Sequence, residues 1–308
     1  MTAPVPMAQL AGMERKDRID GIGALYLVGF AVVLAFNQVV IKLGNGGFQP
    51  VFMAAMRSFF AMLVLLVWAR ARGIPLRSPR GTWGAGLLIG GLFSFEFVAL
   101  FWALDHTSVA RASILFYTMP VMLSLAAHFL LPGEQLTRMR GLGLVLAMCG
   151  VALVLADRQG GQASLMGDLA ALGAAAGWGG IALAVRVTRA QDLVPEVQLL
   201  WQLLVSSVVL FAVAPLFGPF LRDPGLWHWA GVGYQVIAVA SFGFLFWFFL
   251  MKRYPASGVA SFSFLSPVVS VLLGWAVLGE TFGMNVVVAL VLVAIGIVLI
   301  NRRPRMPG

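Results

Sequence analysis

The chain has 308 residues, of which 60% are hydrophobic and only 11% are charged, and its mean hydropathy is +0.93. An ordinary soluble domain is roughly 45–50% apolar and about 25% charged. A chain this apolar has too few polar side chains to cover a soluble fold, which argues against a soluble enzyme, a disordered regulator or a secreted scaffold. The single cysteine, Cys149, has no partner within the chain for a disulfide.

Ten apolar windows follow one another along the chain, each long enough for a membrane helix. A hydrocarbon core about 30 Å thick takes roughly 20 helical residues. The windows are residues 22–42, 51–69, 83–103, 109–131, 139–156, 167–185, 197–217, 229–250, 257–278 and 284–301. We therefore predict an all-α integral membrane protein with ten transmembrane helices. Residues 1–21 form a polar segment that does not resemble a cleavable signal, and 302–308 form a short tail.

The distribution of positive charge predicts the orientation. The net charge is +9, with 21 Lys and Arg against 12 Asp and Glu. If each window crosses the membrane once, sixteen of the positive residues lie on the side of the two termini. Four lie on the other side, Lys42, Arg111, Arg158 and Arg222, and Arg57 lies within a span. The positive-inside rule then places both termini in the cytoplasm, so the charge reports topology and not nucleic-acid binding.

The two halves of the chain resemble each other. At an offset of 144, Gly23 and Gly29 correspond to Gly167 and Gly173. Further along, Pro120-Val121 corresponds to Pro267-Val268, Glu134 to Glu280 and Gly150 to Gly296. Because each half has five spans, the second half enters the membrane from the opposite side. Residues 22–156 and 167–301 are thus predicted to form two inverted repeats, an arrangement typical of secondary transporters that work by alternating access.

Several stretches resemble a known family across essentially the whole chain. They are Asn37…Lys42, Arg57-Ser58-Phe59, Thr107-Ser108-Val109-Ala110-Arg111-Ala112, Tyr117-Thr118-Met119-Pro120, Trp178-Gly179-Gly180, and Tyr254-Pro255-Ala256-Ser257 with Leu278-Gly279-Glu280. In these the chain resembles the ten-helix, EamA-type branch of the drug/metabolite transporter superfamily. The resemblance implies a bacterial inner-membrane carrier of small metabolites, often an exporter. The family usually has Trp where the first span has Leu34, whereas Trp178 keeps it in the second half.

Two charged residues lie deep in the predicted spans, Arg57 and Glu96, and Asn37 lies at a comparable depth. Burying charge in a bilayer is costly, so such residues indicate function by default. One hypothesis is that Arg57 binds a substrate carboxylate or pairs with Glu96, while Glu96 binds a substrate ammonium group or carries protons. The alternative is a permanent Arg57–Glu96 ion pair that only joins two helices. Gln202 is the counterpart of Arg57 in the second half.

Aromatic residues and prolines complete the candidate site. Trp178, in mid-span, is the preferred cavity aromatic, and Tyr117 just before Pro120 is within reach of a substrate or of freed backbone groups. Pro120 and Pro267 are predicted to kink their spans at equivalent positions, as hinges or as static bends. Lys42 is interpreted chiefly as an anchor at the membrane interface.

The sequence favours a secondary carrier, and no enzyme, nucleotide-binding or metal-binding motif is found. We expect export of small amphipathic metabolites, with amino acids as the first class, since few polar groups occur among many aromatic side chains. Uptake is the nearest alternative, followed by a lipid-modifying enzyme or a passive channel. The expected partners are the substrate and the bilayer, with proton coupling as a hypothesis, no cofactor, no nucleic acid and a monomeric state.

Overall fold

The computed structural model describes residues 19–131, 136–157, 163–254 and 262–301. Within these ranges it is all-helical, with no strand and one isolated antiparallel bridge between Phe48 and Leu221. The predicted all-α class is therefore confirmed for the described residues. Most of the polar N-terminal segment, the tail, Glu134, Arg158 and the stretch Pro255-Ala256-Ser257 lie outside them.

The helices follow the predicted windows closely. The first half contains α1 (Gly21–Gly44), α2 (Pro50–Ala71), α3 (Trp83–His106), α4 (Val109–Phe116), α5 (Met119–Leu130) and α6 (Arg138–Ala156). The second contains α7 (Leu165–Val187), η2 (Arg189–Asp192), α8 (Pro195–Val213), η3 (Ala214–Phe217), α9 (Leu226–Tyr234), the π-helical η4 (Gln235–Gly243), α10 (Phe244–Arg253), η5 (Phe262–Phe264), α12 (Leu265–Leu278) and α13 (Met284–Asn301).

Eight helical stretches of the described chain are long and apolar enough to cross a membrane. They are α1, α2, α3, α4 with α5, α6, α7, α8 with η3, and α13, and α12 is a shorter apolar helix. Residues 226–253 are also helical, but as three successive segments with a π-helical middle. The window 257–278 begins in residues that are not described. Its helix is therefore seen only from Phe262 onward.

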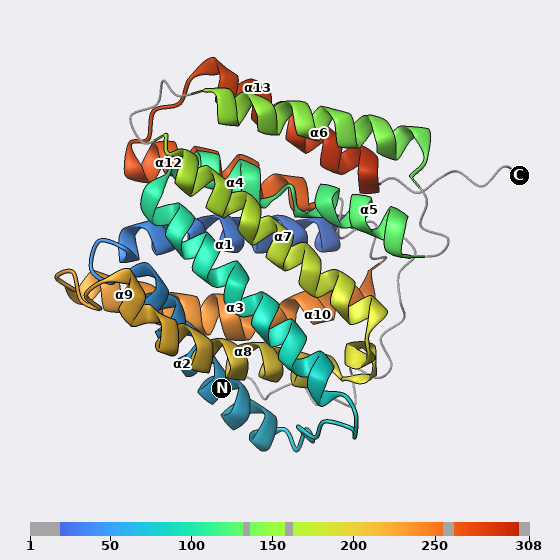
Figure 1. The fold of residues 1–308 in the computed structure, drawn as a ribbon, viewed down its shortest axis with the longest axis vertical. Coiled ribbons are helices and arrows are strands. Elements are labelled where there is room, and N and C mark those ends of the chain that lie inside the picture. The colour runs from blue at the N-terminus through green and yellow to red at the C-terminus, as the bar shows by residue number, and fades with distance from the viewer. Residues whose placement is uncertain (1–18, 132–135, 158–162, 255–261, 302–308) are drawn as a thin grey trace, which may run out of the picture.

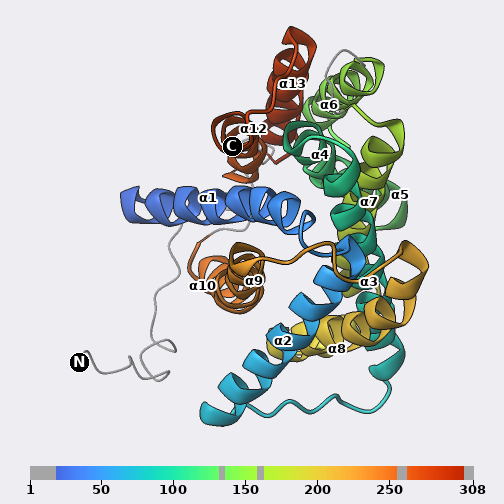
Figure 2. The same cartoon turned by 90° about the vertical axis from the view of Figure 1, so that its left-hand side faces the viewer.

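The helices form a bundle in which segments from the two halves alternate. In Figures 1 and 2, α6 and α13 lie side by side at one end, together with α4 and α12, and α2 and α8 lie at the other end. Between them α3 packs along α7 and α8, while α1 packs against α12, α9 and η4. Large apolar side chains such as Val208, Phe129 and Phe242 are exposed on the outside, as expected for a surface that faces lipid.

Small residues allow the closest helix contacts. A Cβ atom on Gly150 of α6 would lie 2.8 Å from the carbonyl oxygen of Ala289 on α13, and one on Gly143 would lie 2.8 Å from that of Gly296. Gly90 on α3 meets Trp201 and Val205 of α8 in the same way. This backbone contact is what small residues at helical spacing provide in membrane proteins.

Pro120 and Pro267 are predicted to kink their spans, and the structure places each of them near the start of a helix. The fourth window is broken at Tyr117-Thr118, so that Pro120 lies in the first turn of α5, and Pro267 lies in the first turn of α12. A first-turn proline lacks only an N–H group that has no acceptor within the helix, so it starts a helix without distorting it. The fourth span is thus interrupted by a two-residue turn.

Candidate functional site

Arg57 on α2 and Glu96 on α3 are both buried in the protein, with only 4% and 6% of their surface exposed. The guanidinium carbon of Arg57 lies 4.3 Å from the centre of the Phe97 ring, a cation–π contact. The two charges are close enough to interact electrostatically, but no ion pair joins these two residues in this conformation. Arg57 Nε and Nη1 and Glu96 Oε2 have no hydrogen-bond partner within the protein.

Unpartnered buried charges are rare because each costs several kcal/mol, roughly, unless a ligand, water or counter-ion satisfies it. The interior of the bundle therefore holds free hydrogen-bond donors on Arg57 and a free acceptor on Glu96. A guanidinium with free Nε and Nη groups has the geometry to bind a carboxylate with two parallel hydrogen bonds. The carboxylate of Glu96 is an acceptor for an ammonium group or a site for a proton.

Local sequence holds both charged helices in place. The Gln49 side chain caps α2 by accepting a hydrogen bond from the Phe52 N–H, and its own amide donates to the Ala214 carbonyl at 3.1 Å. On α7, a Cβ atom at Gly177 would lie 3.2 Å from Glu96 Cα, so this glycine lets α3 and α7 approach at the level of the acid.

Two other predicted residues form an aromatic corner. Trp178 on α7 is stacked on Phe116, with ring centres 5.1 Å apart, and meets Tyr117 edge to face at 6.1 Å. Tyr117 itself is buried and occupies the break between α4 and α5. The structure therefore brings Tyr117 and Trp178 together, at the place where the fourth span is interrupted.

Asn37 and Gln202 are buried on α1 and α8, but no hydrogen bond joins either to Arg57 or Glu96 in this conformation. The Asn37 side-chain oxygen has no hydrogen-bond partner within the protein, as for Arg57 and Glu96. Of the six predicted binding residues, two thus form one aromatic contact and two are electrostatic neighbours. The last two, Asn37 and Gln202, lie on other helices inside the bundle.

A second polar cluster lies where α4, α6 and α7 meet. Arg111 on α4 donates to both oxygens of Asp168 on α7, through Nη2 at 2.6 Å and Nε at 3.1 Å. It also donates to the backbone carbonyls of Asp157 at 2.8 Å and Val154 at 2.5 Å. The Thr107 hydroxyl donates to Asp168 at 2.9 Å. Both charged side chains are almost fully buried, so this is a paired and hydrogen-bonded ion pair.

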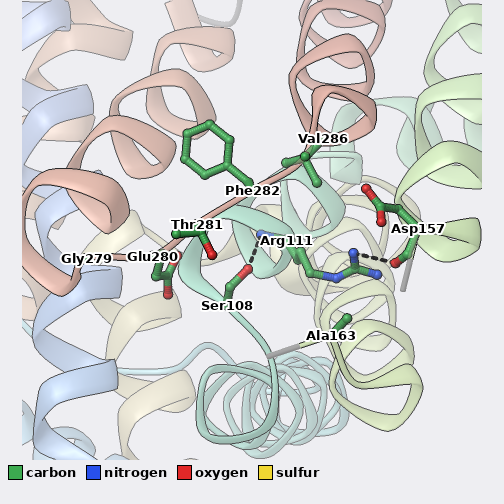
Figure 3. Close-up of a pocket in the computed structure, with 10 residues that line it drawn as sticks. Ser108, Arg111, Asp157, Ala163, Gly279, Glu280, Thr281, Phe282 and Val286 are labelled. Carbon is green, nitrogen blue, oxygen red and sulfur yellow. Dashed lines mark hydrogen bonds between the residues drawn. The ribbon is translucent and has the colours of Figure 1, made fainter. Parts of the chain in front are cut away.

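Glu280, just after α12, extends this cluster. Its two oxygens accept hydrogen bonds from the Val109 and Ala110 N–H groups, at 2.7 and 3.2 Å, and so cap the first turn of α4. A cavity of about 280 Å³ lies beside it (Figure 3), with Ser108, Arg111, Asp157, Glu280 and Thr281 on its walls. The polar groups of Arg111 and Glu280 in this wall already have protein partners, so the cavity is bordered by structural contacts.

Lys42, interpreted from the sequence as an interfacial anchor, makes a hydrogen bond within the protein. Its ammonium group is partly buried and donates to the Thr107 carbonyl at 2.6 Å, at the C-terminal end of α3. A cation close to the last carbonyls of a helix is favourable both as a donor and through the helix dipole. Lys42 therefore joins the ends of α1 and α3 instead of extending to lipid head groups.

Comparison with known proteins agrees with this architecture. The model of the EamA-like transporter family matches residues 21–156 and again 165–302. The chain belongs to the EamA-like transporter family. Two matches to one family model, together covering most of the chain, also agree with the repeat seen in the sequence.

Individual relatives of this EamA-like transporter cover nearly its full length. It is 26% identical to the uncharacterized transporter YvbV of Bacillus subtilis, over 92% of both chains. It is 28% identical to a protein of Salmonella typhimurium named as a probable amino-acid metabolite efflux pump, over 92% of this chain and 94% of that one. A crystal structure with 25% identity superposes with a TM-score of 0.64, covering 90% of this chain and 97% of the other. The protein is thus a multi-pass transporter of the bacterial inner membrane.

Sequence reasoning missed the Arg111–Asp168 pair of this EamA-like transporter. From the sequence, Arg111 counts only among the charges of the outer side, whereas the structure buries it in α4 with 3% of its surface exposed. The sequence does contain a signal for this pair, because Asp168 directly follows Gly167, the glycine that corresponds to Gly23 in the first half. Buried acids at such positions usually have a cationic partner, and Arg111 is a nearby candidate in the predicted topology.

Proposed function

We propose that this EamA-like transporter is a secondary carrier that exports small amphipathic metabolites, amino acids first among them, by alternating access. In this proposal ten transmembrane helices form two inverted repeats, residues 22–156 and 167–301, with both termini in the cytoplasm. The helix contacts support such a repeat. α2 packs on its counterpart α8 and α6 on its counterpart α13, while α5 packs on α7 as its counterpart α12 packs on α1.

The observation that carries the substrate assignment is the buried pair of unpartnered charges, Arg57 and Glu96. A substrate with a carboxylate and an ammonium group would satisfy both at once, and an apolar body would lie against aromatic side chains such as Trp178. Tyr117, Asn37 and Gln202 would supply further polar contacts. The name of the Salmonella relative, a probable amino-acid metabolite efflux pump, supports the same class and direction.

In this proposal the two prolines begin mobile helices and do not kink continuous ones. Because Pro120 begins α5 directly after the break at Tyr117-Thr118, rotation of α5 against α4 needs no rupture of a continuous helix. Pro267 at the start of α12 would act in the same way in the second repeat. The two segments would then move as alternate gates around the substrate site.

Counterflow in proteoliposomes tests the carrier function, since only a carrier exchanges labelled for unlabelled substrate across a closed gate. A panel of labelled amino acids is the probe. We expect exchange by the unsubstituted protein, loss of at least tenfold in Arg57→Gln, and little change in Arg70→Gln, an exposed arginine on the same helix. Exchange that survives in monodisperse Arg57→Gln would contradict the substrate site.

The same preparation tests proton coupling. If Glu96 carries a proton, a pH gradient alone should drive accumulation by the unsubstituted protein. Glu96→Gln should then lose the response to the gradient, because glutamine cannot exchange a proton, and the counterflow that remains after loss of the ammonium contact should not depend on pH. If the two proteins respond equally to the gradient, Glu96 is not the coupling group.

A further inference from the structure

The first helix of each half begins with the same local pattern. Asp20 caps the N-terminus of α1 by accepting from the Gly23 N–H at 2.8 Å, and Ser164 caps α7 by accepting from the Gly167 N–H at 3.2 Å. The two caps are 144 residues apart, as are the two glycines. Equivalent positions of the repeats therefore start these helices in the same way.

Each of these glycines lies against the residue that follows the third helix of the opposite half. A Cβ atom on Gly23 would lie 2.6 Å from the Tyr254 ring, and Tyr254 directly follows α10. A Cβ atom on Gly167 would lie 2.9 Å from Thr107 Cβ, and Thr107 directly follows α3. Both contacts are closer than side chains tolerate, so only glycine allows these two approaches.

An acid completes each contact with a hydrogen bond. The Tyr254 hydroxyl donates to Asp20 Oδ1 at 2.9 Å, and the Thr107 hydroxyl donates to Asp168 Oδ1 at 2.9 Å. The acids occupy different positions because the donors differ in length. A tyrosine reaches the cap itself, whereas a threonine requires an acid one turn further into the helix. The two ends therefore make the same kind of contact with different residues.

We propose that these contacts are two latches that close opposite ends of the substrate path in turn. The inner latch consists of Asp20, Gly23 and Tyr254, and the outer latch consists of Thr107, Gly167 and Asp168. The proposal rests on the proposed alternating-access function and names the contacts that must break in each half of the cycle. Each latch joins one half of the chain to the other, so relative motion of the halves has to open it.

The two latches have different surroundings. Asp168 of the outer latch also holds Arg111 with two charged hydrogen bonds. On the same side, Arg222 of the second half donates to Asp105 at the end of α3 at 2.8 Å. The inner latch includes the Tyr254–Asp20 hydrogen bond and the apolar packing of Tyr254 against Leu27 and Leu250.

Cysteine accessibility tests both latches from each side of the membrane. The reporter is Asn37→Cys in a Cys149→Ser background, labelled with a membrane-impermeant maleimide in inside-out and right-side-out vesicles. Gly23→Ala pushes the Tyr254 ring away, and we expect labelling from the cytoplasmic side to become about tenfold faster. Gly21→Ala, two residues earlier in α1 with open space around its Cβ, is the matched control and should not differ from the parent.

The outer latch is tested in the same way. Gly167→Ala should raise labelling from the external side by several-fold, while Gly173→Ala, where a Cβ would meet neighbours only at 3.6 Å or more, should leave it unchanged. Tyr254→Phe removes only the hydroxyl of the inner latch and should raise cytoplasmic labelling by about tenfold, the effect of losing one charged hydrogen bond. Tyr26→Phe on α1, an exposed tyrosine, is its control.

The outcomes distinguish the latches from the carrier function. Faster labelling from the cytoplasmic side in both Gly23→Ala and Tyr254→Phe, with both controls unchanged, supports the inner latch. Unchanged labelling in these two variants, while the unsubstituted protein performs counterflow, refutes it. Faster labelling from the external side in Gly23→Ala would refute the assignment of sides. Absence of counterflow by the unsubstituted protein would refute the carrier function instead.

Discussion

Asp168→Asn is the most direct test of the cluster that joins the two halves. Asp168 accepts hydrogen bonds from Arg111 Nε at 3.1 Å, from Arg111 Nη2 at 2.6 Å and from Thr107 Oγ1 at 2.9 Å. Its side chain is 0% exposed and that of Arg111 is 4% exposed. Asparagine keeps the size but removes the charge and replaces one acceptor oxygen with an NH2 donor, so the buried guanidinium loses its counter-charge and one of its side-chain acceptors.

The expected cost follows from that burial. Removing one partner from a buried ion pair lowers the free energy of unfolding by about 3–5 kcal/mol, because the other charge stays buried without compensation. Asp192→Asn is the matched control, since the Arg189–Asp192 pair has the same chemistry but side chains 61% and 44% exposed. That pair is solvated, so its loss should cost no more than about 1 kcal/mol.

The assay is reversible unfolding in mixed detergent micelles, followed by circular dichroism. The single variants Arg111→Met and Asp168→Leu and their double variant are measured alongside, because replacing both charges by apolar groups should recover most of the loss. If Asp168→Asn costs no more than Asp192→Asn, the ion pair does not stabilise the fold. If the double variant is as unstable as the sum of the single ones, the two residues are not coupled.

Two further predictions concern the helix contacts and the aromatic corner. Gly150→Leu should destabilise the protein by about 1–3 kcal/mol in the same assay, because its side chain would run into the backbone at Ala289, whereas Gly141→Leu, with open space around its Cβ, should be nearly neutral. Equal effects of the two would refute the close α6–α13 contact. Trp178→Ala should raise the counterflow KM several-fold and Trp178→Phe much less, since phenylalanine keeps a ring against Phe116; an unchanged KM in Trp178→Ala would remove this residue from the site.

Much of the fold was predictable from local sequence. Each apolar window corresponds to helical residues wherever the chain is described, because a segment surrounded by lipid must satisfy its own backbone hydrogen bonds. The turn before Pro120 was not predictable, since the sequence shows that a proline is present but not whether the preceding turn continues the helix. Of the candidate site, Arg57 and Glu96 are predicted because charge is rare in such spans.

What only the tertiary structure decided is which charges have partners. Arg57 and Arg111 are both arginines in apolar helices, and nothing in their neighbouring residues distinguishes them. Arg111 is paired because Asp168, 57 residues further on, is carried to it by the packing of α4 on α7. Arg57 lies over Phe97 with two of its nitrogens unpartnered. Length and composition determine that such a segment is helical, because every backbone group in the hydrocarbon must find its hydrogen bond within the segment. Pairing depends on contacts between helices distant in sequence, so it emerges only when the two halves come together.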